Sequence, residues 1–191
     1  MSSISIIGLG NVARALAARA LAGGNAVEII GRNPAKAEEL AAALGGATVG
    51  TAGAAPAGDI VVLAVPYVGA ASVVSEYGDA LQGKVIIDVT NPVTPDFKGF
   101  VTPDDSSGAQ EIAKAAPAGA HVVKAFNTLF SHVLAAGPAE GRPLDVFIAG
   151  DDAQAKARVS ASSRAWNCVR WTPGSCRWRG HWRTSACWSW A

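Results

Sequence analysis

Cysteine and tryptophan are absent from the first 165 residues of this 191-residue chain, and long apolar runs are absent throughout. No segment approaches the roughly 20 consecutive apolar residues that a membrane-spanning helix needs. The amino-terminus passes directly into a β-branched run, without the basic segment, apolar core and cleavage site of a secretory signal. We therefore expect a soluble, cytoplasmic protein without a membrane partner. The hydrophobic content of 50% predicts one domain with a substantial core.

Net charge is also small, at a formal +1, but it is distributed unevenly. Residues 1–160 carry 11 Lys and Arg and all 15 Asp and Glu, which gives 11 − 15 = −4, whereas residues 161–191 carry five Arg and no acid. A mildly acidic body is not typical of a nucleic-acid-binding protein. We therefore expect a small molecule, and no nucleic acid, as the partner of this chain.

Residues 161–191 differ in composition from everything before them. All six Trp and all three Cys lie between Trp166 and Trp190. A structural zinc site is disfavoured because no close Cys-x-x-Cys pair occurs. A basic aromatic surface for single-stranded nucleic acid is disfavoured because no helical or strand periodicity gathers the rings on one face. The third interpretation is that this segment is translated out of frame.

The genetic code makes the frame interpretation testable on paper. Tryptophan has the single codon UGG, so a reading shifted to the third base gives Glu where Trp166 meets Asn167, and Leu where Asn167 meets Cys168. The shifted text can read as an ordinary strand followed by an amphipathic helix. We hypothesise a change of frame near Ser160 to Ser163, which divides the chain into a body of residues 1–160 and an aberrant tail of residues 161–191. If the printed tail is real, we expect it to pack poorly.

The most informative segment lies near the amino-terminus, where a β-branched run meets Gly8-Leu9-Gly10-Asn11-Val12-Ala13 and then an Ala/Leu-rich helical pattern. A strand that delivers a tight glycine turn onto a helix amino-terminus presents free N–H groups and the positive end of a helix dipole to a pyrophosphate. Ala13 replaces the third glycine of the usual fingerprint. The alternative is an ordinary strand-to-helix turn, and the alternation of strands and helices downstream favours the nucleotide.

That alternation continues along the body of the chain. It predicts an α/β, Rossmann-type, doubly wound and mainly parallel sheet with helices on both faces. The predicted strands cover residues 4–7, 26–30, 47–49, 59–65, 84–89, 121–126 and 145–150. Three predicted helices cover residues 11–22, 34–44 and 69–77. Three more are predicted from their first residues: one begins near Ser107 with a capping box to Gln110, one is capped by Asn127 and Thr128, and one is opened by Asp151 and Asp152.

The second strand ends in Gly31-Arg32-Asn33-Pro34, with Lys36 four positions after Arg32. An NAD-selective fold usually places an acid here for the ribose 2′-hydroxyl. Two cations and no carboxylate favour a 2′-phosphate, and hence NADP over NAD. The alternative is that Arg32 and Lys36 are solvated surface charges.

Two further strand ends should face the same crevice. Ala64-Val65-Pro66 ends one buried strand and Asn91-Pro92 comes directly after the next, so both are expected on the nicotinamide side. Asn91 can bond the nicotinamide ribose or carboxamide, or it can cap the turn before Pro92. Tyr67 is expected beside the cofactor or as a partly buried aromatic. The loop to Asp105 is the candidate for a mobile flap.

These motifs, together with Val122-Val123-Lys124-Ala125-Phe126-Asn127-Thr128 and residues 145–152, resemble the family of NADPH-dependent coenzyme F420 reductases (F420H2:NADP oxidoreductases) over residues 1 to about 160. A similar domain occurs in membrane metalloreductases, where it passes electrons from NADPH to a flavin. The resemblance implies NADP(H) as cofactor and coenzyme F420 or a flavin as hydride partner. It also implies that the carboxyl-terminal portion helps to complete the acceptor pocket and subunit contacts, as in a homodimer.

In such enzymes the nicotinamide and the deazaflavin lie face to face, so positioning and exclusion of water replace acid–base catalysis. We therefore expect no catalytic side chain and no metal site. Consistent with this, His121 and His132 are expected to be structural or exposed, and Asp151 and Asp152 have no companion acids or histidines. The alternatives are a non-catalytic NADPH sensor, a flavin or ferric reductase, and a reductase of a small imine or carbonyl.

The residues assigned to the pyrophosphate are Gly8, Leu9, Gly10, Asn11 and Val12. Those assigned to the 2′-phosphate end are Gly31, Arg32, Asn33 and Lys36, and those assigned to the nicotinamide side are Ala64, Val65, Pro66, Asn91 and Pro92.

Overall fold

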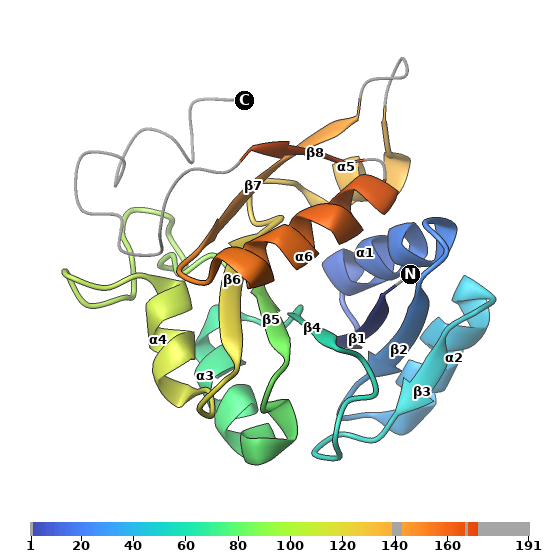
Figure 1. Ribbon diagram of the computed structural model, residues 1–191, viewed down its shortest axis with the longest axis horizontal. Coiled ribbons are helices and arrows are strands. Elements are labelled where there is room, and N and C mark those ends of the chain that lie inside the picture. Colours follow the sequence, from blue (N-terminus) through green and yellow to red (C-terminus); the bar gives the residue numbers. More distant parts are fainter. Residues whose placement is uncertain (1, 139–142, 167, 172–191) are drawn as a thin grey trace.

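Eight strands form one sheet in the order β3-β2-β1-β4-β5-β6-β7-β8 (Figure 1). The computed structural model describes residues 2–138, 143–166 and 168–171. Strands β1 to β6 are parallel, β7 runs antiparallel to β6, and β8 is parallel to β7. The strands are β1 (Ser3–Ile7), β2 (Ala26–Ile30), β3 (Thr48–Gly50), β4 (Ile60–Leu63), β5 (Val85–Asp88), β6 (His121–Ala125), β7 (Leu144–Gly150) and β8 (Cys168–Trp171). The reversal of order at β1 confirms the expected doubly wound, Rossmann-type fold.

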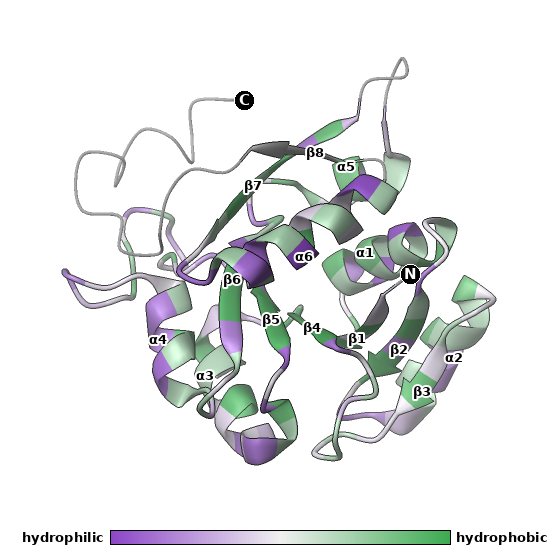
Figure 2. Ribbon diagram, viewed as in Figure 1, coloured by the Kyte–Doolittle hydropathy of each residue, from purple (hydrophilic) through white to green (hydrophobic). Residues whose placement is uncertain are grey.

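Helices cover both faces of the sheet. They are α1 (Asn11–Ala22), α2 (Pro34–Leu44), α3 (Tyr67–Tyr77), α4 (Gly108–Ala115), α5 (Ser131–Ala136) and α6 (Ala153–Ala165), with a short 3₁₀ helix at Gly78–Leu81. Helices α1, α2, α5 and α6 pack on one face, and α3, α4 and the 3₁₀ helix pack on the other. Along β4 the side chains alternate between the two cores, as the two-residue period of a strand requires. Both cores are apolar, and β4 is hydrophobic along its whole length, whereas β1, β5 and β6 also contain polar residues (Figure 2).

Most element boundaries agree with the sequence prediction, and the differences have local causes. Helix α3 begins at Tyr67, directly after Pro66, and not at Gly69. Asn127 and Thr128 do not cap α5, because the chain turns once more before that helix starts. Phe126 has a positive φ of 63°, its carbonyl accepts the Leu129 N–H, and Phe130 occupies the cap position. Asp152 caps α6 as expected, and Ser107 and Gln110 form the predicted capping box of α4.

The start of the predicted tail packs onto the core. Helix α6 runs through the proposed boundary at residue 160 without a break, and Trp166 and Cys168 are both 2% exposed. Poor packing is therefore the wrong expectation for these two residues. Residues 172–191, which include His181 and the other two cysteines, lie outside the described residues, and the division into two segments stays a prediction. None of the helices in the described ranges is long and apolar enough to cross a membrane.

Candidate dinucleotide-binding site

The glycine turn after β1 is held by its neighbours on both sides. Gly8 N–H donates to the Ile30 carbonyl of β2 at 2.9 Å, and Ala64 N–H donates to the Ile7 carbonyl at 2.9 Å. Gly8 has a φ of +133°, and a Cβ placed on it would overlap the carbonyl group of Ala64. Only glycine fits this position, because both the backbone angle and the contact exclude a side chain.

Gly10 has the opposite environment. It is the N-cap of α1, no side chain caps the helix there, and a Cβ placed on Gly10 would meet no atom within 4 Å. The first turn of α1 therefore has no side-chain cap, and Gly10, Asn11 and Val12 line a cleft, which is the arrangement that binds phosphate at a helix amino-terminus. Arg14 N–H is the first amide that the helix itself satisfies, by donating to the Gly10 carbonyl at 3.0 Å.

A cleft of 440 Å³ lies at the carboxyl ends of β1, β4 and β5. This edge of a doubly wound sheet is where ligands bind. The residues that line it are Gly10, Asn11, Val12, Ala64, Val65, Pro66, Tyr67, Val68, Val89, Thr90, Asn91, Val93 and Val101. The structure thus brings together seven of the sequence-predicted site residues, from the pyrophosphate turn (Gly10, Asn11, Val12) and the nicotinamide side (Ala64, Val65, Pro66, Asn91).

The remaining predicted residues lie outside this lining. Gly8 is packed against the backbone of Ala64. The Leu9 side chain packs against Gly31, and a side chain at position 31 would collide with Leu9. Pro92 sits beside Tyr67 and Gly108, behind Asn91. Arg32 is exposed just after β2 and Lys36 is exposed in the first turn of α2, and neither forms an ion pair with the residues that the structure describes.

Asn33 has a structural function that the sequence analysis missed. Its side-chain oxygen accepts the Lys36 N–H at 3.1 Å and so caps α2. The signal was present, because Asn followed by Pro at the first helical position is a common helix start. The cap fixes the end of β2 and therefore the backbone that carries Arg32.

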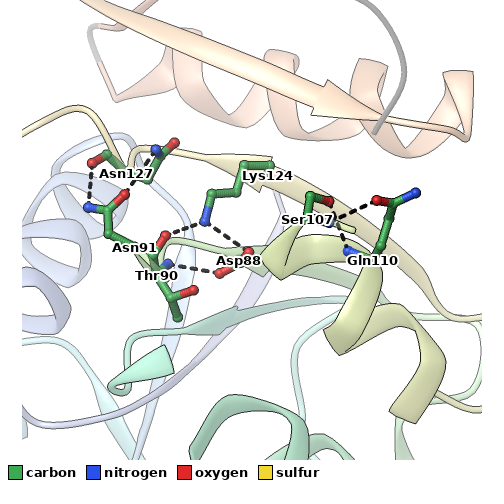
Figure 3. Close-up of polar contacts among 7 residues, drawn as sticks. All are labelled: Asp88, Thr90, Asn91, Ser107, Gln110, Lys124 and Asn127. Atoms are coloured by element: carbon green, nitrogen blue, oxygen red, sulfur yellow. Dashed lines mark hydrogen bonds and ion pairs between the residues drawn. The ribbon is translucent and has the colours of Figure 1, made fainter. Parts of the chain in front are cut away.

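A cluster of polar side chains joins the ends of β5 and β6 next to Thr90 and Asn91, which line the cleft (Figure 3). Asn91 Nδ2 donates to the Asn127 carbonyl at 3.0 Å, and Asn127 Nδ2 donates back to Asn91 Oδ1 at 3.2 Å. Asp88 and Lys124 form an ion pair at 2.9 Å between β5 and β6. The sequence analysis placed Asn127 at the crevice but did not identify this pair, although a charged residue in each of two adjacent apolar strands was a usable signal.

Tyr67 lies at the start of α3 and is partly buried. Its ring passes beside Gly108 and Pro92, where a Cβ on Gly108 would lie 3.1 Å from Tyr67 Cε2. Desolvation raises the pKa of the Tyr67 phenol, and the carboxylates of Glu111 and Asp88 raise it further. The phenol therefore remains neutral and protonated at physiological pH. It is the only titratable side chain among the described residues of the cleft lining.

The segment after Asn91 is more ordered than a structureless loop. Val93 and Phe100 form an antiparallel bridge, Thr94 N–H donates to the Gly99 carbonyl at 2.9 Å, and Val101 N–H donates to the Pro92 carbonyl at 3.0 Å. This hairpin places Val93 and Val101 in the cleft wall. Its movement as a flap stays a prediction.

The described residues contain no group of three or more His, Cys, Asp or Glu placed to hold a metal ion. His132 is exposed and stacks on Phe130 with ring centroids 5.6 Å apart, and His121 is exposed at the start of β6. Asp152 is occupied as the cap of α6.

The sheet order, the glycine turn and the cleft at the strand ends define a Rossmann-type dinucleotide-binding protein. Residues 3–92, which form β1 to β5 and the turn after it, match the family model described as NADP oxidoreductase, coenzyme F420-dependent. Residues 3–92 therefore form a domain of that family of NADP oxidoreductases.

Three of the proteins that this chain resembles show the extent of the likeness. Metalloreductase STEAP3 of Rattus norvegicus is 34% identical over 162 residues, which cover 85% of this chain and 32% of that protein, so the chain spans about a third of its length. The crystal structure of a hypothetical protein from Sinorhizobium meliloti shares 29% identity with a TM-score of 0.83, covering 92% of this chain and 86% of that one. A candidate F420-dependent NADP reductase from Arthrobacter sp. FB24 shares 22% identity with a TM-score of 0.79 and the same coverage, and its likeness shows the fold.

Proposed function

We propose that this protein transfers a hydride between NADP(H) and coenzyme F420, a deazaflavin. The observation that carries the proposal is the composition of the cleft. One wall is an open phosphate-binding turn, and the lining that faces the nicotinamide side is mostly apolar, with Tyr67 as its one titratable side chain. Such a site suits a reaction that needs orientation and exclusion of water, and does not need an acid–base pair.

The residues present fit a dinucleotide phosphate. Gly10 and the following residues of α1 would hold the pyrophosphate through free N–H groups, since nothing occupies the space beside Gly10. Arg32 and Lys36 would hold the 2′-phosphate, because both are exposed and without an ion-pair partner among the described residues. Val65, Pro66 and Asn91 would face the nicotinamide from the cleft wall.

When bound, NADPH supplies the hydride. In the proposed reaction NADPH, the oxidised acceptor and one proton from solvent would give NADP⁺ and the reduced acceptor. The protein's own task is to hold the two rings in contact and keep bulk water from between them. The valines at positions 65, 68, 89, 93 and 101 supply the apolar contacts for this purpose.

A flavin is the alternative acceptor, because the chain is 34% identical to a protein named a metalloreductase. A non-catalytic NADPH sensor is a further alternative. The F420 reductase, the flavin reductase and the sensor differ in what happens after NADPH binds. Purified protein is mixed with NADPH and, in parallel, with F420, FMN or FAD, and absorbance is monitored for both partners. We expect NADPH oxidation together with bleaching of the deazaflavin absorbance band. Turnover with FMN or FAD but not with F420 would identify a flavin as the hydride acceptor. NADPH binding without turnover of any acceptor would indicate a non-catalytic sensor.

Cofactor choice is tested by Arg32→Glu. Loss of a charge-assisted phosphate contact should raise the KM for NADPH by about 10- to 100-fold and leave the KM for NADH nearly unchanged. Arg158→Glu, an equal charge change at an exposed position of α6, is the matched control and should change neither constant. Equal effects of Arg32→Glu on the two cofactors would reject the assignment of Arg32 to the 2′-phosphate.

A further inference from the structure

We infer that Lys124 is a positioning residue for the nicotinamide side of the cleft, acting through the Thr90–Asn91 peptide together with Asp88. The inference rests on the proposed binding of NADP(H). The Asp88–Lys124 ion pair is not part of the cleft lining, and it contacts the lining through the backbone N–H and carbonyl of Thr90.

The geometry places both partners directly beneath the cleft wall. Asp88 and Lys124 are register partners on the adjacent parallel strands β5 and β6, so their side chains lie on the same face of the sheet. The Asp88 side chain is 0% exposed and that of Lys124 is 19% exposed, and Nζ lies 2.9 Å from Asp88 Oδ2. Thr90, two residues beyond Asp88, lines the cleft.

The pair holds both polar backbone groups of Thr90. Asp88 Oδ1 accepts the Thr90 N–H at 2.8 Å, and Lys124 Nζ donates to the Thr90 carbonyl oxygen (Figure 3). A trans peptide is planar, so the carbonyl of Thr90 and the N–H of Asn91 point in opposite directions. By fixing the carbonyl, Lys124 therefore fixes the Asn91 N–H so that it points away from the ion pair.

The side chain of Asn91 is fixed separately. Its reciprocal hydrogen bonds with Asn127 orient the amide, while one amide hydrogen and an oxygen lone pair stay available for a ligand. Asn91 is therefore presented with both its backbone and its side chain oriented before any cofactor binds. Such preorganisation lowers the free-energy cost of binding a polar group.

Stability alone is a weak reason for this pair. Desolvation of a buried ion pair offsets much of its attraction, and well-packed apolar residues in the same place are often as stable. Two apolar side chains would also continue the hydrophobic pattern of β5 and β6. What they could not do is hold the Thr90 carbonyl and N–H at once, which is the feature that the charged pair provides.

The experiment compares two ligands on two variants. Asp88→Asn retains an oxygen for the Thr90 N–H and retains Lys124. The double variant Asp88→Asn/Lys124→Met removes the bond to the Thr90 carbonyl without leaving a buried unpaired carboxylate. Calorimetric titrations use NADPH and adenosine 2′,5′-bisphosphate, which has the 2′-phosphate end of the cofactor but no nicotinamide. Thermal melts establish that each variant is folded.

Relative to Asp88→Asn, the double variant should raise the Kd for NADPH about tenfold, because the released Thr90–Asn91 peptide must then be ordered when the cofactor binds. Its Kd for adenosine 2′,5′-bisphosphate should stay within about twofold, and Lys114→Met, which removes the exposed ion pair with Glu111, should change neither. An equal loss for both ligands, or no loss for NADPH, would overturn the inference. These titrations involve no hydride acceptor, so failure of F420 turnover in the wild-type protein would count against the proposed function alone.

Discussion

Phe126 and Trp166 stack with their ring centroids 5.4 Å apart and an angle of 27° between the ring planes. Both are almost fully buried, at 1% and 2% exposed. The end of α6 is thereby attached to the turn after β6. Arg19 of α1 strengthens the attachment, since its guanidinium donates to the carbonyls of Leu134 at 2.5 Å and Trp166 at 3.1 Å. One arginine thus joins the ends of α5 and α6 to α1.

Replacement of Trp166 should therefore destabilise the whole domain. Trp166→Ala removes a large buried ring and its stacking partner, and we expect a loss of about 3 to 5 kcal/mol in the free energy of unfolding. Denaturant titration measures the loss. Phe147→Ala, at a side chain that is 43% exposed, is the control and should cost much less. A loss below about 1 kcal/mol for Trp166→Ala would contradict the observed packing.

Alanine at the two glycines of the turn should separate folding from binding. Gly8→Ala should lower stability by about 2 kcal/mol or more, because the new Cβ collides with the Ala64 carbonyl at a positive φ. Gly10→Ala should fold with near wild-type stability, since its Cβ meets nothing, but should bind NADPH at least about tenfold more weakly. Thermal melts and NADPH titrations of both variants check the two expectations. Tight NADPH binding by the Gly10→Ala variant would contradict the assignment of the pyrophosphate to this turn.

Two buried serines near the hypothesised frame change should respond differently to alanine. Ser160 Oγ is buried without a hydrogen-bond partner in the part of the chain that the structure describes, whereas Ser163 Oγ donates to the Val159 carbonyl at 2.8 Å. Ser160→Ala should therefore stabilise the protein by about 1 kcal/mol, and Ser163→Ala should be neutral or slightly destabilising. Differential scanning calorimetry of the pair measures this, and destabilisation by Ser160→Ala would mean that its hydroxyl has a partner.

Buried polar atoms without hydrogen-bond partners are also relevant to the hypothesis of a frame change near residues 160–163. Trp166 Nε1 is also buried without a partner among the described residues, so two of the three such atoms lie on either side of residues 161–165, the third being Thr90 Oγ1. Buried polar groups without partners are uncommon in native proteins. Sequencing the encoding DNA tests the hypothesis directly: an alternate frame without a plausible strand and helix would refute it.

The thiol of Cys168 should be unreactive in the folded protein. Burial raises its pKa, and the positive charge of Arg19 lowers it only in part. A raised pKa keeps the thiol protonated when folded, so its contribution to stability is present below the unfolded-state pKa of about 9 and is lost as pH rises above that value. Mass-spectrometric labelling near pH 8 should leave Cys168 unmodified until denaturant is added. Rapid native labelling at Cys168 would contradict its burial.

The sequence alone determined the nucleotide-binding half of the fold, because the relevant interactions are local. The glycine turn, the start of α2 at Pro34 and the capping box of Ser107 and Gln110 each depend on residues within a few positions of one another. Alternating apolar patterns set the strands, and the parallel order results from the helices between them. The cations Arg32 and Lys36 were visible as a spacing.

Only the tertiary structure decided the rest of the site. Asn91 meets Asn127, and Asp88 meets Lys124, each across 36 residues of chain, and no local pattern specifies such partners. The antiparallel direction of β7 and the hairpin after Asn91 likewise depend on which strands are neighbours. Burial of Trp166 reversed the expectation drawn from tail composition, because the contact with Phe126 exists only once β6 and α6 have been brought together. Contacts between distant residues are fixed by the packing of whole elements, and in this protein that packing placed Thr90 and Asn91 in the wall of the cleft.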